Sequence, residues 1–150
     1  MSELDVDALV GTIVDFNRFF IRLPMREKLP FTTLSVIDTL ASTGRPMRLS
    51  ELTKTEQVTQ PRLTQLIAQL ERDGLVAREP DPRDRRATLI QLTEEGHRIT
   101  RSRHQDRVDR LRPLVAQLTD EQRKALAGVL PALRHLTELA DEPRPGTVDK

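Results

Sequence analysis

Three arginines stand close together in the run DPRDRR: Arg83, Arg85 and Arg86. A guanidinium is always charged, and its planar set of N–H donors matches phosphate oxygens and the edges of bases. On a projecting loop such a side chain can enter the narrow minor groove of A·T-rich DNA, where the negative potential is strongest. The run therefore predicts contact with a nucleic acid. The alternative for Arg86 is a solvated side chain paired with Asp84.

The segments around the arginines favour a two-stranded ribbon. Leu75–Ala77 begin one strand and Thr88–Leu92 form the other, while Glu79–Arg86 between them holds two prolines and charges of both signs. Turn residues of this kind join antiparallel strands through a long loop. We expect this loop to carry the arginines away from the body of the protein.

A helix is predicted directly before the ribbon, from about Gln60 to Asp73. Thr59 is a suitable N-cap, Pro61 lies in the first turn where its missing N–H costs nothing, and Gly74 suits the left-handed residue after a helix. Apolar residues at helical spacing give this helix one buried face: Leu63, Leu66, Ile67 and Leu70. The outer face of its first two turns has no carboxylate and suits base edges and phosphates: Gln60, Pro61, Arg62, Thr64 and Gln65. For Pro61, starting the helix is as good an explanation as touching DNA.

Two runs of the sequence, Val58–Glu79 and Asp81–Gly96, resemble the MarR (multiple antibiotic resistance regulator) family of winged helix-turn-helix transcription regulators. The second run is the more specific, since it joins an Asp-x-Arg wing tip to a strand and to Leu-Thr-x-x-Gly. The resemblance implies a mainly α fold with a small two- to three-stranded β-wing. It also implies that Arg86 inserts into the minor groove, that Asp84 orients the wing arginines, and that the helix from Gln60 reads the major groove.

The chain departs from the family pattern at two places before this recognition helix. Glu56-Gln57-Val58 stands where many members have Leu-Gly-Val, which predicts a locally different turn. Arg48 stands where a small capping hydroxyl is common, so we expect Ser50 to cap the short helix and Arg48 to be free to reach a phosphate. The residues expected at the DNA are Arg48, Thr59, Gln60, Pro61, Arg62, Thr64, Gln65, Arg83, Asp84, Arg85 and Arg86.

The composition fits a single folded domain that stays in the cytoplasm. Of 150 residues, 37% are hydrophobic and 31% charged, and neither Trp nor Tyr occurs, so the core must be aliphatic. No apolar stretch approaches the roughly 20 residues of a membrane span, and the acidic start MSELDVDALV is unlike a signal peptide. The chain has no cysteine, which excludes disulfides, thiolate metal sites and cysteine redox sensing.

The net charge is only +1, but the charges are unevenly distributed. Gly44–Arg112 contains 15 Lys/Arg and 11 Asp/Glu, whereas the rest of the chain contains 9 and 12. The basic residues are therefore concentrated around the predicted DNA-binding elements. A surplus of this size predicts moderate, salt-sensitive affinity for DNA rather than indiscriminate binding.

Three helices are expected before the recognition helix. The second spans about Thr32 or Thr33 to Ser42, and the third spans about Ser50 to Glu56 with Leu52 facing inward. The first spans Val6 to about Leu23, and its apolar stripe is too broad for one neighbour to cover. That stripe consists of Leu9, Val10, Ile13, Val14, Phe16, Phe19 and Phe20.

Two helices are expected after the ribbon. Thr93 should cap a long helix to about Leu118. The middle of this helix is too polar to be buried against one domain, which suggests a strut that connects two packed regions. Three arginines of this strut would offset the charge of DNA only if the strut lies near the DNA backbone. They are Arg101, Arg103 and Arg107. Thr119–Gln122 forms a capping box for the last helix, in which Pro131 should cause a bend. Its apolar residues are Leu126, Val129, Leu130, Leu133, Leu136 and Leu139 or Ala140.

The surplus of apolar surface at both ends of the chain predicts a homodimer. We expect one domain over residues 1–140, with dimerisation helices at 1–24 and 108–140, a winged helix-turn-helix at 32–92 and a connecting helix at 93–118. Residues 141–150 should form a disordered tail. Two-fold related recognition helices would lie on the order of 34 Å apart and require a pseudo-palindromic operator. The expected function is a transcriptional repressor.

Other functions fit the residues less well. His97, His104 and His135 lack cysteine partners and the spacing of a chelating pair, so we expect no metal and no cofactor. We also expect no enzymatic activity, because no nucleophile with a base, glycine-rich loop or twin-carboxylate cleft is visible. Core packing explains the phenylalanines better than a cavity for a small aromatic effector, which the resemblance allows: Phe16, Phe19, Phe20 and Phe31. A dimeric module that docks a protein instead of DNA is the remaining alternative.

Overall fold

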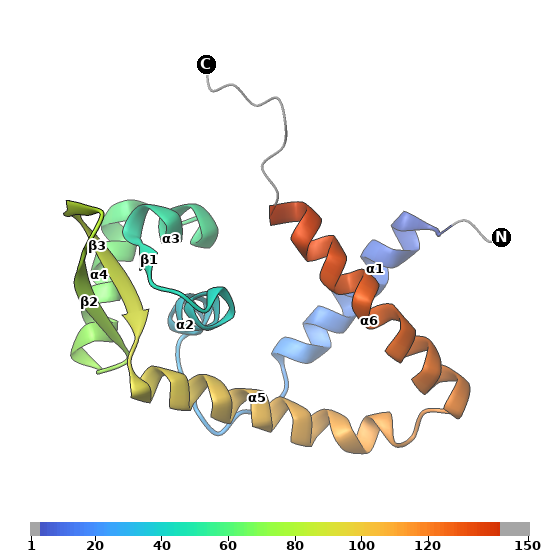
Figure 1. The fold of residues 1–150 in the computed structure, drawn as a ribbon. Helices are drawn as coiled ribbons and strands as arrows, with labels where there is room; N and C mark the ends of the chain where they lie inside the picture. Colours follow the sequence, from blue (N-terminus) through green and yellow to red (C-terminus); the bar gives the residue numbers. More distant parts are fainter. Residues whose placement is uncertain (1–3, 142–150) are drawn as a thin grey trace. The chain divides into compact units, whose positions relative to one another are not determined.

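The fold is mainly helical, with one small antiparallel sheet, in the computed structural model, which describes residues 4–141 (Figure 1). This arrangement confirms the expected fold class. The helices are α1 (Val6–Ile21), α2 (Phe31–Thr43), α3 (Leu49–Glu56), α4 (Gln60–Arg72), α5 (Glu94–Val115) and α6 (Asp120–Asp141). The strands are β1 (Met47–Arg48), β2 (Val76–Asp81) and β3 (Asp84–Leu92).

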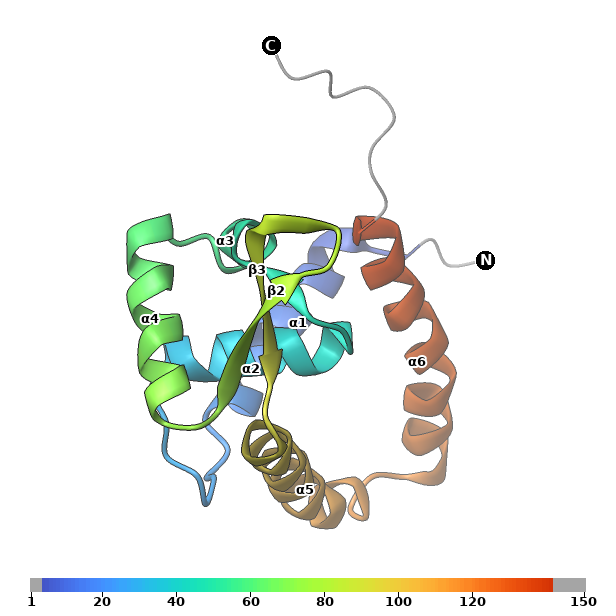
Figure 2. The same ribbon diagram turned by 60° about the vertical axis from the view of Figure 1, so that its left-hand side comes forward.

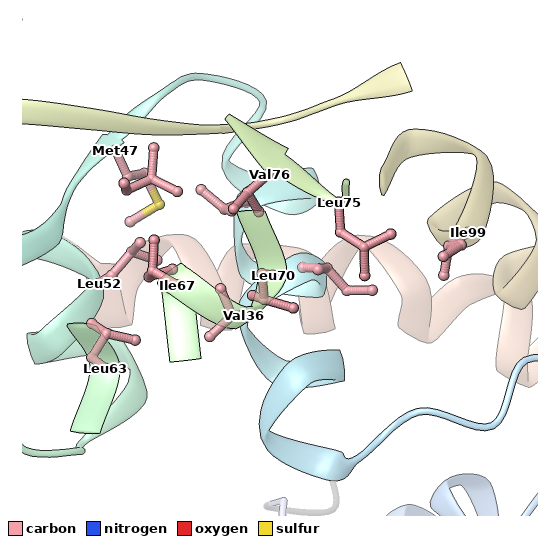
Figure 3. Close-up of a cluster of buried hydrophobic side chains, with 12 residues drawn as sticks. Val36, Met47, Leu52, Leu63, Ile67, Leu70, Leu75, Val76 and Ile99 are labelled. Carbon is pink, nitrogen blue, oxygen red and sulfur yellow. The ribbon is translucent and has the colours of Figure 1, made fainter. Parts of the chain in front are cut away.

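An aliphatic core joins α2, α3, α4 and the sheet (Figure 3). The α4 residues Leu63, Ile67 and Leu70 have 0% exposed surface, as the helical spacing predicts. Leu52 of α3 is equally buried, and so is Ile37 of α2. Each fully buried aliphatic side chain of this kind contributes about 1.5–3 kcal/mol to folding. The core therefore determines which face of α4 points outward.

A Schellman motif ends α4 where the sequence predicts it. Gly74 adopts a left-handed φ of 74°, its N–H donates to the Glu71 carbonyl, and the Leu75 N–H donates to the Leu70 carbonyl at 2.9 Å. Asp73 is the C-cap, so the helix is one residue shorter than predicted. The motif turns the chain directly into β2, which places the hairpin beside α4 (Figure 2).

The ribbon is longer, and its turn shorter, than the sequence predicts. The strands pair from Val76 with Leu92 as far as Asp81 with Asp84, so only Pro82 and Arg83 lie between them. The predicted long loop is therefore wrong. The sheet order is β1-β3-β2, which makes β2 an edge strand, and an edge strand tolerates a proline because one side of its backbone needs no partner.

The first turn of α5 is docked onto the turn that precedes β2. The Thr93 hydroxyl accepts from the Gly96 N–H at 3.1 Å, which confirms the predicted cap, and donates to the Gly74 carbonyl at 2.5 Å. A Cβ added at Gly96 would lie 2.3 Å from the Leu75 carbonyl oxygen. Only glycine allows this close approach of the two backbones.

The helices at the chain ends differ somewhat from their predicted bounds. The first helix ends at Ile21 rather than Leu23, and α5 ends at Val115 rather than Leu118. The capping box of α6 is confirmed, because the Thr119 hydroxyl accepts from the Gln122 N–H while the Gln122 side chain accepts from the Thr119 N–H. The predicted disordered tail lies outside the described residues, apart from Asp141.

The middle of α5 is not the solvated strut that the sequence predicts. Arg103 and Asp106 are each only 5% exposed, and Ile99 joins the core. Asp106 accepts from the Arg26 N–H at 2.9 Å and lies 3.2 Å from the Arg26 Nε. This partner is 80 residues away in sequence, so the helix pattern alone could not reveal it.

Contacts divide the chain between Asp109 and Arg110 into two compact units. The first holds α1 to α4, the sheet and most of α5, and the second holds the end of α5 and α6. In the second unit, Arg123 donates to the carbonyls of Ala116 and Leu118, which closes the turn between the helices. The organisation as one domain stays a prediction.

Replacing Gly96 with Ala should destabilise the protein by about 2 kcal/mol, because the methyl group must displace the Leu75 backbone. Urea unfolding followed by circular dichroism would measure this loss. The matched control is Gly11→Ala in α1, where an added Cβ meets no atom within 4 Å. A Gly96→Ala variant as stable as the parent protein would contradict the tight docking of α5.

Candidate nucleic-acid interface

The amino-terminal half of α4 presents an exposed face without acidic residues. Because Leu63 and Ile67 are buried, the opposite face of the helix points outward. The five residues predicted to contact DNA there are all exposed: Gln60, Pro61, Arg62, Thr64 and Gln65. The Thr64 hydroxyl donates to the Gln60 carbonyl at 2.9 Å, so it is held against the helix. Thr59 occupies the N-cap position as predicted, but its side chain makes no capping hydrogen bond.

The wing tip, Pro82–Arg86, is exposed along its whole length. The Asp84 carboxylate accepts from the Arg86 backbone N–H at 3.0 Å and does not pair with the Arg86 guanidinium. Within residues 4–141, the side chains of Arg83, Arg85 and Arg86 form no ion pair, and the same holds for Arg62 on α4. These four guanidinium groups can therefore meet phosphates or bases without first giving up a carboxylate.

In the turn between α3 and α4, Gln57 stands at the place of the glycine in the common Leu-Gly-Val, and a locally different turn stays a prediction. Gln57 adopts a left-handed φ of 52°, which glycine would adopt at lower cost. The preceding Glu56 accepts hydrogen bonds from two hydroxyls of α2, those of Ser35 and Thr39, the latter at 2.6 Å. This carboxylate clamps the end of α3 to α2 and holds the turn in place.

Arg48 is not free, contrary to the prediction. It is itself the N-cap residue of α3, so Ser50 does not cap the helix, and its N–H donates to the Glu51 carboxylate at 3.3 Å. The Arg48 Nε donates to Asp81 Oδ2 at 2.7 Å. Asp81 also accepts from the Arg83 N–H at 2.8 Å, and this bond, together with Arg48, holds the pKa of the Asp81 carboxyl below its ordinary value.

A second ion pair ties the hairpin to α4. Arg78 of β2 lies 3.3 Å, Nε to Oε2, from Glu71 in the last turn of α4. Both side chains are partly exposed, so the pair contributes modestly to stability. It nevertheless links the recognition helix to the base of the wing.

A pocket of about 810 Å³ lies between α1, α2 and α5 in the first unit. Its lining includes Phe20, Phe31, Asp38, Arg103 and Arg107. The Arg107 guanidinium lies 5.0 Å from the centre of the Phe20 ring. Burial, and then the neighbouring charge of Arg107, lower the pKa of Arg103. Among the described residues, the buried Nε atoms of both arginines have no hydrogen-bond partner.

The phenylalanines do not form a core, contrary to the preferred prediction. Phe16 is 55% exposed, Phe19 39% and Phe31 76%. The rings of Phe16 and Phe20 are stacked, with their centres 5.9 Å apart. The three strut arginines have different surroundings. Arg103 is buried, Arg107 contacts Phe20, and Arg101 is well exposed beside Glu94.

Three carboxylates that hold these elements together are not among the residues predicted from the sequence: Glu56, Asp81 and Asp106. Asp81 precedes a Pro-Arg turn, and an aspartate before a turn often accepts from the backbone two residues later. The role of Asp81 in the turn can therefore be inferred from the sequence, whereas the ion pair of Asp81 with Arg48 cannot. The partners of Glu56 and Asp106 come from other helices, so no local pattern could identify them.

Comparison with known proteins agrees with this geometry. The sequence model of the MarR family matches residues 30–88. An uncharacterized HTH-type transcriptional regulator of Mycobacterium leprae is 32% identical over 144 residues, which cover 93% of this chain and 98% of the relative. The chain belongs to the MarR family. The match to the HTH-type regulator YdgJ of Bacillus subtilis is 30% identical over 86 residues and spans 57% of this chain and about half, 52%, of that relative.

Solved structures of MarR proteins share the fold. A MarR family transcriptional regulator of Streptomyces coelicolor, solved in complex with DNA, is 25% identical, with a TM-score of 0.58 and coverage of 99% of this chain and 97% of that one. The chain thus shares its fold with MarR family transcriptional regulators. Within residues 4–141, no helix is long and apolar enough to cross a membrane.

Proposed function

We propose that this MarR family regulator binds double-stranded DNA sequence-specifically and represses transcription by occupying a promoter. The observation that carries the proposal is the combination of an acid-free, exposed α4 face with a wing tip whose arginines have no ion-pair partner among the described residues. The Streptomyces coelicolor relative crystallised with DNA supports it. No enzymatic activity is expected, because the family consists of transcriptional regulators.

The proposed contacts divide between two grooves. The α4 residues Gln60, Arg62 and Gln65 would reach base edges in the major groove, with Thr59, Pro61 and Thr64 near the sugar-phosphate backbone. Arg86 would enter the flanking minor groove, where Asp84 orients it by holding its backbone N–H. Arg83 and Arg85 would meet phosphates.

The proposed active form is a homodimer. Neither α1 nor the described part of α6 contains a buried residue, and apolar side chains are exposed along both helices. On α6 these include Leu126, Leu130 and Leu136, each about half exposed. Apolar surface of this extent is typical of an interface between subunits. A two-fold axis would present two α4 helices to an inverted-repeat operator.

Release from DNA would be triggered by a small aromatic effector in the pocket between α1, α2 and α5. Phe20 and Phe31 line the pocket and offer an apolar surface for a ring. Arg103 and Arg107 line the same pocket, and their guanidinium charges favour a ligand that carries an anionic group. A ligand shifts the protein towards a DNA-free state only if it binds that state more tightly.

Replacing Arg86 with Ala should weaken binding to a selected operator by about 1–3 kcal/mol and reduce the salt dependence of affinity. Fluorescence anisotropy across a salt titration measures both quantities. The control variant is Lys28→Ala, which removes one exposed positive charge from the linker between α1 and α2. Equal affinity of the Arg86→Ala and parent proteins would remove Arg86 from the interface, and no binding of any duplex by the parent would favour a protein-docking module.

Placing a charge on the apolar face of α6 should dissociate the dimer. The Leu130→Glu substitution should cost about 3 kcal/mol of association energy, because a carboxylate would be buried without a partner. His135→Glu is the control, since it lies about 140° further round the same helix. Sedimentation equilibrium gives the association state. A parent protein that remains monomeric at micromolar concentration would refute the dimer.

An aromatic carboxylate such as benzoate should lower DNA affinity by about ten-fold, whereas the neutral benzamide should not. The effect should disappear in the Arg103→Met variant, whose shorter, unbranched side chain keeps the aliphatic part of arginine and lacks the guanidinium. Anisotropy competition with a panel of such acids provides the measurement. If no acid in the panel changes DNA affinity at millimolar concentration, the proposed effector class is wrong.

A further inference from the structure

A buried carboxylate at the base of the wing tip binds an arginine from the start of the helix-turn-helix. Asp81 is 4% exposed. Its Oδ2 accepts from the Arg48 Nε at 2.7 Å and lies 2.5 Å from a terminal nitrogen of the same guanidinium. Its Oδ1 accepts from the Arg83 N–H at 2.8 Å. One carboxylate thus holds both the turn of the hairpin and a residue 33 positions earlier in the chain.

The two partners lie on opposite sides of the central strand. Arg48 belongs to β1 and pairs with Leu89 of β3, whereas Asp81 is the last residue of β2, where the pairing with β3 becomes irregular. Because the sheet order is β1-β3-β2, the Arg48 side chain must reach across β3 to meet Asp81. The ion pair therefore connects the first residue before α3 to the end of the hairpin that carries the wing arginines.

The pairing of β2 with β3 carries the hairpin as far as Asp81 and Asp84, with an irregularity between Pro80 and Asp81, and few side-chain contacts add to it near the wing tip. The pair of Arg78 with Glu71 lies within β2, three residues before Asp81, and ties that part of the hairpin to α4. The bond from Asp84 to the Arg86 N–H is local to the tip. Beyond Asp81, every residue as far as Arg86 is exposed. The pair of Arg48 with Asp81 is the long-range ion pair nearest to the wing arginines in the part of the chain that the structure describes.

Arg48 is also poorly suited to contact a phosphate. If its guanidinium moved to DNA, the buried Asp81 carboxylate would lose its charged partner, which is costly in a desolvated site. The arginine is thus held where it is by the carboxylate. Its contribution to DNA binding would come through the geometry of the wing rather than through its own charge.

We propose that Arg48 and Asp81 are positioning residues that set the direction of the wing tip relative to α4. This inference depends on the proposed function, since the wing must reach DNA for its direction to affect affinity. In that case the pair determines how strongly the sequence of the flanking minor groove influences binding. The base contacts of α4 would remain unaffected.

The charge change caused by Asp81→Asn gives a sharp test. This variant loses one negative charge beside the DNA-binding face. A purely electrostatic effect would therefore tighten binding, whereas loss of positioning would weaken it. We expect Asp81→Asn and Arg48→Ala each to lower operator affinity by about ten-fold, and the double variant to be no weaker than either. Arg45→Ala is the matched control, because it removes an exposed arginine paired with Glu51 and leaves the wing intact.

Operators that differ only in the flanking sequence contacted by the wing distinguish a loss of wing positioning from a general loss of folding or DNA binding. The parent protein should prefer an A·T-rich flank over a G·C-rich flank, and both variants should lose most of this preference while still discriminating changes under α4. Tighter binding by Asp81→Asn, additive effects of the two substitutions, or an unchanged flank preference would overturn the proposal.

Amide hydrogen exchange provides a readout that needs no DNA. In Arg48→Ala, the amides of Arg83 and Arg86 should exchange about ten-fold faster, whereas those of α4 should keep their parent rates. Unchanged exchange at the wing tip would refute the positioning pair even if the protein binds DNA. If the parent binds no duplex, the proposed function fails, and this exchange comparison alone decides whether the pair holds the wing.

Discussion

The burial of one face of α4 is the constraint on which the rest of the structure depends. Leu63, Ile67 and Leu70 have no exposed surface, so the helix can adopt only one rotation about its axis without exposing aliphatic side chains. That rotation points Gln60, Arg62 and Gln65 outward. The Schellman motif at Gly74 then sends the chain into the hairpin, so the same packing that orients the helix also determines where the wing begins.

The carboxylates of the wing explain how a chain with a net charge of only +1 can present unpaired arginines. The Asp84 carboxylate accepts from the Arg86 backbone N–H. The Asp81 carboxylate accepts from the Arg83 backbone N–H and from the Arg48 guanidinium. Neither acid forms an ion pair with the side chains of Arg83, Arg85 or Arg86. The acids therefore shape the turn without neutralising its cationic side chains.

Sequence patterns predict those features of the fold that depend on neighbouring residues, such as helix faces and helix ends. The helical spacing of leucines gave the buried face of α4, and Gly74 and Thr93 marked helix ends that the structure confirms. Predictions were wrong where the deciding partner lies far away in sequence. The hairpin turn was predicted too long, because only the sheet order shows that Pro80 lies on an edge strand. The polar middle of α5 was predicted to be solvated, although Asp106 is buried against Arg26.

The roles proposed for single residues at the DNA all depend on one claim, that two copies of the α4 face and wing read a single duplex. Selection of bound duplexes from a random pool, followed by footprinting of the winners, tests this claim most directly. A dimer that reads DNA in this way should select an inverted repeat whose half-site centres lie about one helical turn, on the order of 34 Å, apart, with A·T-rich flanks protected in the minor groove. Recovery of an asymmetric single half-site, or of no enriched sequence at all, would contradict it.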